Sequence, residues 1–312
     1  MFVINRIAII GSGAIGGYYG ARLAQAGMDV IFLLRSDYEH VSEHGLKVSS
    51  VAGDIHLPSV RCVTASAEIG PVDLVIVAWK ATSNSYYEEV ISPLLHQQTL
   101  ILTLQNGLGN VEELARLFGA ERIFGGLCFV CINRTGPGEL CHSASGMIRV
   151  GEYESGVEGI SARLAELVRL LRNGGINAHA EPELSKAQWM KLVWNIPFNG
   201  LAIAEGGVDT AVLLSMPGME DRIRSIMREV QAAGAVMGYE IEDDFLERQI
   251  EVTRPMEAYR PSSMIDYVEG REVEVEAIWR KPVLCARAMG VKVAEIERLL
   301  SEIELQLEQR VN

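Results

Sequence analysis

Basic residues and long apolar runs are both scarce in this sequence. No run approaches the ~18 consecutive apolar residues that a membrane-spanning helix requires. The 28 lysines and arginines are outnumbered by 41 aspartates and glutamates, which leaves a formal net charge of −13. Nucleic acids and anionic membrane surfaces are bound through basic patches, so we expect neither as a partner. An anionic small molecule must then be held by a local basic site.

Cysteine is also uncommon, and its five positions are scattered along 312 residues. An odd number of cysteines, in a chain long enough to be stabilised by its core, does not suggest a disulfide framework and favours a reducing cytoplasm. The opening MFVINRIAIIG carries too short an apolar stretch for a signal peptide and continues directly into glycines. These features predict a cytoplasmic protein.

A zinc site is suggested by Cys128-x-x-Cys131, with Cys141-His142 downstream. The first pair lies in the strand-like segment GGLCFVCIN, where side chains three residues apart point to opposite faces of a sheet. Closed zinc sites instead favour tight turns between their cysteines. We therefore expect buried strand thiols and no metal at these positions.

The first half of the sequence alternates between strand-like and helix-like segments. Runs rich in β-branched and aliphatic residues predict strands at 6–10, 29–34, 73–79, 100–104, 122–132 and 146–151. Helical spacing occurs between these runs, at 11–27, near 83–96, from 110 onward and around 158–173. A β-hairpin is expected around Val51–Asp54. This alternation predicts an α/β domain.

The second half of the sequence is helical throughout. Helical patterns follow one another at 184–204, 208–237, 243–254, 261–289 and 292–310. The last of them, VAEIERLLSEIELQLEQ, is amphipathic and acidic, which suits a packed helix or a homodimer contact better than a membrane. A change from βα alternation to continuous helix marks a domain boundary. We therefore predict an α/β domain over residues 1–181 and an all-α domain over residues 182–312, without a linker between them.

A phosphate-binding loop follows the first predicted strand, because Gly11-Ser12-Gly13-Ala14-Ile15-Gly16 matches the pattern G-x-G-x-x-G. In that pattern the first glycine makes the tight turn, the second lets the backbone approach a pyrophosphate, and the third lets helix and strand pack. The motif alone is weak, and an ordinary glycine-rich turn is the alternative. Its place between a strand and a helix favours a Rossmann-type dinucleotide-binding domain.

Three further positions at the ends of predicted strands bear on the cofactor. Arg35 follows the second strand, where an enzyme that uses NAD usually has an acid for the ribose 2′-hydroxyl. A guanidinium would instead grip a 2′-phosphate, which favours NADP(H), although a plain surface arginine is the alternative. Lys80 and Asn106 follow the strands at 73–79 and 100–104, and we expect them to meet the cofactor or substrate. For Lys80, an exposed lysine at the end of a strand is the alternative.

A polar stripe crosses the first helix expected in the second domain. Lys191, Asn195 and Asn199 recur every four residues and so share one face of a helix that is otherwise almost entirely apolar. Burying an ammonium and two amides without partners would cost several kcal/mol. The stripe therefore either faces a cleft that holds substrate and water or belongs to a buried polar network. Pro197 offers no amide to the Val193 carbonyl, which predicts an irregular helix there.

Together these residues give the chain a resemblance to the ketopantoate reductase family over nearly its whole length. The ordered set comprises GSGAIG at 11–16, Arg35, WK at 79–80, QNGLG at 105–109, W-x-K-L-x-x-N-x-x-x-N at 189–199, Ser262-Ser263-Met264 and GREVEVEA at 270–277. No single element is specific, but the ordered set is. The resemblance implies a Rossmann domain followed by an all-α domain, NADP(H) as cofactor, and reduction of the 2-oxo acid ketopantoate to pantoate on the route to coenzyme A.

The resemblance also implies roles for individual residues. Lys191 matches the family's proton donor to the ketone oxygen, and Glu274 matches a glutamate beside the cofactor and the substrate hydroxyl. The positions that match substrate-binding residues are Asn195, Asn199, Ser263 and Asn106, of which the last also lines the nicotinamide. The implied cofactor-binding set is Gly11, Ser12, Gly13, Ala14, Ile15, Gly16, Arg35, Lys80, Asn106 and Glu274.

Three departures from the family pattern concern the acid and the substrate. The segment from Ser263 to Glu274 is one residue shorter than the pattern, so Glu272 or Glu276 could take the acidic role. Arg260 and Asp209 stand where some members carry asparagine. These two changes bear on substrate choice more than on the chemistry.

Two other functions remain compatible with the sequence. One is a reductase of the same architecture that acts on another branched 2-oxo acid. The other is a non-catalytic NADP-binding redox sensor. The full set of lysine, asparagines, serine and glutamate argues against the sensor, because binding alone requires no acid at the hydride-acceptor site.

Overall fold

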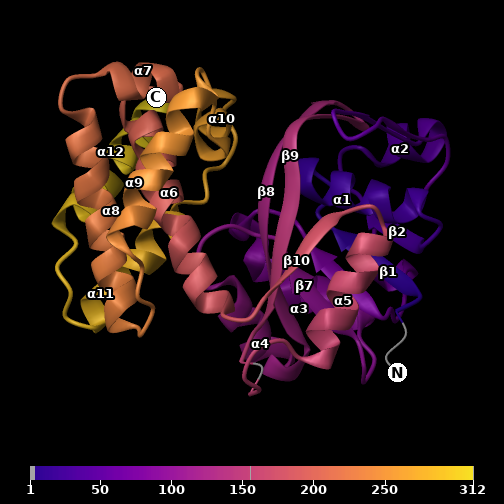
Figure 1. Ribbon diagram of the computed structural model, residues 1–312. Helices are drawn as coiled ribbons and strands as arrows, with labels where there is room; N and C mark the ends of the chain where they lie inside the picture. The colour runs from indigo at the N-terminus through magenta and orange to yellow at the C-terminus, as the bar shows by residue number, and fades with distance from the viewer. Residues whose placement is uncertain (1–3, 155, 312) are drawn as a thin grey trace. The chain divides into compact units, whose positions relative to one another are not determined.

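The computed structural model describes residues 4–154 and 156–311 (Figure 1). The chain forms two compact units. The first holds the chain up to Gln105 and then Asn110–Leu184, and the second holds Asn106–Gly109 and the chain from Ser185 onward. The short excursion at 106–109 belongs with the helical unit, a feature that the order of predicted elements does not indicate.

A mixed sheet forms the frame of the first unit. Its strands are Arg6–Ile10 (β1), Asp29–Leu33 (β2), Leu46–Ser50 (β3), Ile55–Leu57 (β4), Arg61–Val63 (β5), Leu74–Val77 (β6), Leu100–Thr103 (β7), Ile123–Gly136 (β8), Glu139–Glu152 (β9) and Asn177–Glu181 (β10). They lie in the order β4-β3-β9-β8-β7-β6-β1-β2-β5, and β10 pairs with β9. The β8–β9 and β3–β4 pairs are antiparallel and the other pairs are parallel. The α/β prediction is therefore confirmed, including the β3–β4 hairpin.

Strands β8 and β9 are both longer than the sequence pattern suggested, because they form one long hairpin around Gly138, whose φ is +65°. Cys128 and Cys131 lie on β8, as expected, and Cys141 lies on β9. The expectation that the Cys128 and Cys131 thiols are buried was wrong. Cys128 and Cys131 are half-buried and Cys141 is exposed, because the outer part of the hairpin is only partly covered.

Helices flank the sheet in the first unit (Figure 1). They are Ala14–Gln25 (α1), Tyr38–His44 (α2), Tyr87–Ile91 (α3), Asn110–Phe118 (α4) and Ala162–Asn173 (α5), with short 3₁₀ turns at Ser66–Glu68, Ala81–Tyr86, Ser92–Leu94 and Ala120–Arg122. The helix expected near 83–96 is thus a 3₁₀–α–3₁₀ succession. Helix α5 begins later than expected because Ser161 caps it, its Oγ accepting the Leu164 N–H at 3.0 Å.

The second unit is helical within the described residues. Its helices are Leu184–Ala204 (α6), Thr210–Ser215 (α7), Met219–Val236 (α8), Asp243–Thr253 (α9), Ser262–Val268 (α10), Lys281–Ala288 (α11) and Ala294–Val311 (α12), with a 3₁₀ turn at Arg254–Met256 and a π-helical turn at Glu276–Arg280. Two expected long helices are divided. The first ends at Ser215, because Met216 is extended before Pro217, and helix resumes after Gly218, the N-cap of α8. The second breaks at Gly270, which follows α10 with a left-handed φ of +72°. No helix in the described part of the chain is long and apolar enough to cross a membrane.

Each unit has its own hydrophobic core. In the first, apolar side chains of the sheet pack against α1 and α5. In the second, Phe198 of α6 and Trp279 of the π turn are among the largest fully buried side chains. Helix α6 runs unbroken through Pro197, although an irregularity was predicted there.

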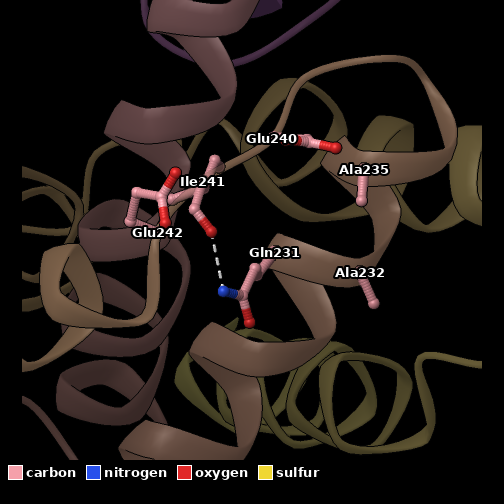
Figure 2. Close-up of a pocket in the computed structure, with 6 residues that line it drawn as sticks. All are labelled: Gln231, Ala232, Ala235, Glu240, Ile241 and Glu242. Carbon is pink, nitrogen blue, oxygen red and sulfur yellow. Dashed lines mark hydrogen bonds between the residues drawn. The ribbon is translucent and has the colours of Figure 1, made fainter.

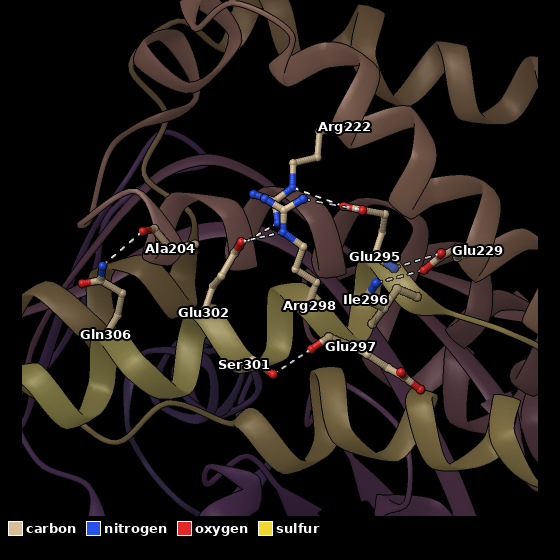
Figure 3. Close-up of polar contacts among 10 residues, drawn as sticks. All are labelled: Ala204, Arg222, Glu229, Glu295, Ile296, Glu297, Arg298, Ser301, Glu302 and Gln306. Atoms are coloured by element: carbon tan, nitrogen blue, oxygen red, sulfur yellow. Dashed lines mark hydrogen bonds and ion pairs between the residues drawn. The ribbon is translucent and has the colours of Figure 1, made fainter.

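Helix α8 packs against α9, α11 and α12. Figure 3 shows polar contacts that align α12 with it. Glu229 of α8 accepts the backbone N–H groups of Glu295 and Ile296 at 3.0 and 2.9 Å, which gives partners to two amides in the first turn of α12. Arg222 of α8 donates to Glu295 in the first turn of α12 and to Glu302, about two turns further along the helix. These contacts hold α8 and α12 together in the helical unit, whose core also contains side chains of α6.

Candidate functional site

The glycine loop between β1 and α1 has the geometry that a pyrophosphate-binding turn needs. Gly11 has φ +87°, and a Cβ built on it would lie 2.2 Å from the backbone N of Trp79. Gly16 lets α1 pack closely, because its Cβ would lie 2.4 Å from the Gly11 carbonyl oxygen and 3.1 Å from Ile9 Cγ2 of β1. At Gly13, the N-cap of α1, a Cβ would meet nothing within 4 Å. The open space at the helix N-terminus therefore lies where a phosphate would approach the backbone.

The other residues of this loop hold it in place. Ser12 Oγ donates to the carbonyl of Leu33 at 3.4 Å, which ties the loop to the end of β2. Ala14 is the first residue of α1, and Ile15 packs against the core of the first unit. The six residues from Gly11 to Gly16 thus form the loop-to-helix turn that the sequence predicted.

An exposed guanidinium follows β2. Arg35 is exposed, and no carboxylate among residues 4–154 and 156–311 lies within ion-pair distance of it. The nearby acid Asp37 is buried and engaged, because it pairs with Arg134 Nη2 at 2.5 Å and accepts the Gly138 N–H. The end of β2 therefore presents a cation, and the acid two residues further on, Asp37, is occupied by other partners. This arrangement suits a 2′-phosphate better than a ribose 2′-hydroxyl.

The ends of three parallel strands bring further predicted residues to one edge of the sheet. Val77 is in register with Ile10 on one side and with Thr103 on the other, so β1, β6 and β7 end together. Lys80 follows β6, half-buried, and its carbonyl accepts the Ser83 N–H at 2.9 Å. Lys80 and the glycine loop therefore lie at the same sheet edge, the usual ligand edge of such folds.

A polar network at the end of β7 was not anticipated from the sequence. Gln105 Oε1 accepts from Tyr87 Oη and, at 2.8 Å, from Thr103 Oγ1. Its Nε2 donates to Asn84 Oδ1 at 2.7 Å, and Asn84 Nδ2 donates to Asn110 Oδ1 at 2.8 Å. These residues lie far apart in sequence and carry no periodic signal. They fix Gln105, the residue that immediately precedes the 106–109 loop.

In the helical unit, the ammonium of Lys191 faces Asn106. Lys191 Nζ donates to Asn106 Oδ1 at 2.9 Å, and both side chains are half-buried. These two residues are 85 positions apart in sequence. The structure therefore brings together the lysine of the polar stripe and the asparagine of the QNGLG segment within one unit.

The rest of the stripe becomes progressively more buried along α6. Asn195 is 8% exposed and Asn199 is 2% exposed. Asn199 Oδ1 accepts the backbone N–H of Ser263, itself buried, at 2.9 Å. Because this N–H lies in the first turn of α10, it has no partner within that helix, and Asn199 supplies one. The stripe thus runs from a half-buried lysine bonded to Asn106 to a buried amide that belongs to a polar network with Ser263.

Burial distinguishes the three glutamates of the GREVEVEA segment. Glu272 is exposed, and Glu276 is exposed and pairs with Arg280 at 2.9 Å. Glu274 is 9% exposed and lies two residues before the start of the π-helical turn. A carboxylate kept from solvent needs specific partners, so Glu274 is the glutamate of the three whose position suits a site.

The two departures from the family pattern have different environments. Asp209 is the N-cap of α7, where its Oδ1 accepts the Val212 N–H at 2.9 Å. Arg260 is exposed just before α10, between Tyr259, whose ring contacts that of Trp194, and Ser263. The first is explained by helix capping. Arg260 places a guanidinium on the segment 259–263, which contacts α6 through Tyr259 and Ser263.

A pocket of about 310 Å³ lies elsewhere in the helical unit (Figure 2). It is lined by Gln231, Ala232, Ala235, Glu240, Ile241 and Glu242, and Gln231 Nε2 donates to the Ile241 carbonyl at 2.7 Å. None of the residues predicted from the sequence to bind cofactor or substrate lines it.

Two family models match the chain. The model described as "Ketopantoate reductase PanE/ApbA" matches residues 7–155, and "Ketopantoate reductase PanE/ApbA C terminal" matches residues 183–306. A 2-dehydropantoate 2-reductase from Nostoc sp. is 39% identical over 302 residues, which cover 96% of this chain and 94% of that protein.

Solved structures of related proteins have the same fold. A crystal structure of 2-dehydropantoate 2-reductase from Geobacter metallireducens is 45% identical, with a TM-score of 0.92 over 96% of this chain and 99% of that one. The enzyme of the same name from Methylococcus capsulatus is 31% identical, with a TM-score of 0.89 over 98% of both chains. A D-mandelate dehydrogenase at 22% identity and a TM-score of 0.89, covering 98% and 99% of the two chains, shares the fold.

Proposed function

Because the chain belongs to the ketopantoate reductase family, we propose that it reduces 2-dehydropantoate (ketopantoate) to pantoate with NADPH, in pantothenate biosynthesis. The observation that carries the proposal is the hydrogen bond from Lys191 Nζ to Asn106 Oδ1. It holds a half-buried ammonium, the kind of group that can protonate a ketone oxygen, against the Asn106 side chain of the QNGLG segment.

The proposed chemistry assigns the acid to Lys191. Bound NADPH supplies a hydride to the C2 carbonyl carbon of the substrate. As that bond forms, negative charge develops on the ketone oxygen, and the Lys191 ammonium stabilises the charge and then donates its proton, leaving a secondary alcohol. A lysine is normally protonated at neutral pH, so the acid is ready before the substrate arrives. The amide of Asn195 and the hydroxyl of Ser263 would orient the substrate carboxylate and hydroxyl without adding charge.

The remaining assignments follow from local geometry. Residues 11–16 would cradle the pyrophosphate, because Gly13 leaves open space at the N-terminus of α1. Arg35 would hold the 2′-phosphate, and Lys80 lies at the same sheet edge. Glu274, the buried glutamate, would lie beside the substrate hydroxyl and the cofactor. In this proposal residues 1–181 form the NADP(H)-binding domain and residues 182–312 the substrate domain. Asn106 joins the substrate domain through the 106–109 loop, and Glu274 serves both ligands.

A second candidate is a reductase for a different 2-oxo acid. Arg260 supports it, because its exposed guanidinium could pair with an additional anionic group that ketopantoate does not carry. The fold itself does not select the substrate, since the D-mandelate dehydrogenase shares it. The two candidates differ in substrate and not in the role of Lys191.

The test is the loss of NADPH absorbance when ketopantoate is added, compared with 2-oxoisovalerate, pyruvate, 2-oxoglutarate and NADH. Fast turnover confined to NADPH and ketopantoate is expected. A preference for 2-oxoglutarate, which carries a second carboxylate, would support the alternative built on Arg260. Tight NADPH binding with no turnover on any 2-oxo acid would instead favour a redox sensor.

We also propose a cytoplasmic location and a homodimer. The location is supported by five scattered cysteines, an odd number that does not suit a disulfide framework. The dimer is supported by the amphipathic helix α12, which leaves Leu305 52% exposed. Light scattering of the purified protein would decide the oligomeric state, with a single-chain mass of 34.2 kDa contradicting the dimer.

A further inference from the structure

The π-helical turn at Glu276–Arg280 leaves one backbone carbonyl without a helical partner. In this turn the Lys281 N–H donates to the carbonyl of Glu276, five residues back. In the same register the carbonyl of Ala277 would accept from residue 282. That residue is Pro282, which has no N–H. The register and the proline together make the Ala277 carbonyl available to a donor from elsewhere in the chain.

The donor is the 106–109 loop. The Leu108 N–H donates to the Ala277 carbonyl at 2.9 Å, and the Leu108 side chain is buried in the core of the helical unit. Gly107 makes this approach feasible. Its φ is +82°, and a Cβ built on it would lie 2.3 Å from the Ala277 oxygen and 2.4 Å from the Ala277 carbonyl carbon. A side chain at position 107 would therefore force the loop away from the turn.

The same turn also contacts helix α6. Trp279 Nε1 donates to the carbonyl of Ile196 at 3.0 Å, and both groups are buried. Gly200 provides the room, because its Cβ would lie 2.8 Å from that indole nitrogen. Ile196 lies on α6 between Lys191 and Asn199. The π turn therefore binds both the loop that carries Asn106 and the helix that carries Lys191.

We propose that this turn is a positioning element for the acid: Ala277 and Trp279 hold loop and helix so that Asn106 Oδ1 faces the Lys191 ammonium. The inference rests on the proposed function for the role of Lys191. An ordinary α-helical turn would bond the Ala277 carbonyl within the helix, and the loop would lose its anchor. The π register therefore leaves the Ala277 carbonyl free to anchor the 106–109 loop, which an α-helical register would not do.

The main test compares Gly107→Ala with Gly206→Ala. Gly206 has φ +83°, so alanine meets the same backbone strain there, but its Cβ would meet nothing within 4 Å. Hydrogen exchange of the Leu108 amide reports the contact with Ala277. We expect Gly107→Ala to lose this protection and to lower kcat about 10²-fold, a loss typical of a catalytic group misplaced by ~1 Å. Gly206→Ala should lower the melting temperature but leave Leu108 protection and kcat unchanged.

A titration reports the acid without requiring turnover. The chain has six lysines, so isotope-labelled lysine NMR can follow Lys191, with Lys191→Arg to assign its signal. In Gly107→Ala the ammonium loses an acceptor that stabilises it, so its titration midpoint should move to lower pH. An unchanged midpoint, or unchanged Leu108 protection, would overturn the proposal. Absence of ketopantoate turnover in the wild type would instead count against the proposed function. The Leu108 exchange and the Lys191 titration would still test whether the π turn positions Lys191.

Pro282→Ala provides a milder second variant. It introduces an N–H that can compete for the Ala277 carbonyl, so partial loss of Leu108 protection is expected. Pro93→Ala is the matched control, because Pro93 also lies at the start of a short helix, in the first unit. Equal Leu108 protection in the two proline variants would show that the missing N–H at position 282 is irrelevant.

Discussion

Asn199 Oδ1 accepts the backbone N–H of Ser263 at 2.9 Å, and both residues are 2% exposed. The amide of α6 thus fixes the start of α10, the segment that carries a predicted substrate-binding serine. In the family resemblance Asn199 is a substrate-binding position. Its geometry shows that it also supports the position of Ser263.

Replacing Asn199 should therefore affect folding, whereas replacing Asn195 should affect substrate binding. In Asn199→Ala the Ser263 N–H is left buried without its acceptor, so the free energy of unfolding should fall by ~1–3 kcal/mol. Asn195→Ala should raise the KM for the 2-oxo acid with a smaller loss of stability. Urea denaturation and steady-state kinetics on both variants give the comparison. Equal stability of the two variants would mean that the contact with Ser263 contributes little.

Lys191→Ala should lower kcat by about 10²–10⁴-fold, the usual contribution of a positioned general acid. NADPH affinity should survive, since the glycine loop and Arg35 belong to the other unit. Lys186→Ala is the matched control, because Lys186 lies on the same helix and is also half-buried. Kinetics with nucleotide titration separate the two effects. Wild-type turnover in Lys191→Ala would remove this residue from the mechanism.

The sequence predicted the parts of the site that depend on local patterns. The glycine loop has a fixed spacing between a strand and a helix, and the stripe on α6 repeats every four residues. The partner of Lys191 could not be derived this way, because Asn106 is 85 positions away and their contact depends on tertiary packing. The expectation of one helix over 261–289 was wrong because apolar spacing continues past Gly270 while the backbone there turns left-handed.

The π turn illustrates what a sequence pattern leaves out. Proline in the first turn of a helix, as Pro282 is in α11, is common and gives no unusual signal. Its effect on the Ala277 carbonyl follows only when the hydrogen-bond register is known. Likewise, three glutamates in GREVEVEA are equivalent in sequence, and only their burial separates Glu274 from Glu272 and Glu276.

Arg35→Ala should weaken NADPH binding about 10–100-fold while leaving NADH binding unchanged, because a hydrogen bond to a charged group contributes ~1.5–3 kcal/mol and only NADPH has the 2′-phosphate. Arg228→Ala, a substitution in the helical unit, is the control for a general change in charge. Fluorescence titration with both nucleotides measures the ratio of dissociation constants. An equal loss of affinity for NADPH and NADH would indicate that Arg35 does not contact the 2′-phosphate.

His142 should make the first unit sensitive to mild acid. The ring is 1% exposed, and Nδ1 lies 2.8 Å from Ser50 Oγ while Nε2 lies 3.1 Å from the Ala144 carbonyl oxygen. Burial, together with the nearby Arg22 guanidinium, holds the pKa of His142 below the ordinary histidine value. The folded state therefore binds fewer protons than the unfolded state once the pH falls below the ordinary histidine pKa of ~6.5.

The stability that His142 contributes is thus fully present above ~pH 6.5, is lost progressively as the pH falls below that value, and stops declining below the folded-state pKa. His142→Asn keeps a neutral side chain at every pH and removes this dependence. Melting temperatures of the wild type and the variant, measured from pH 8 to pH 5 in steps of about half a unit, should converge as the pH falls. A constant difference in melting temperature between the two proteins across that range would mean that His142 binds protons equally in the folded and unfolded states, contrary to its burial.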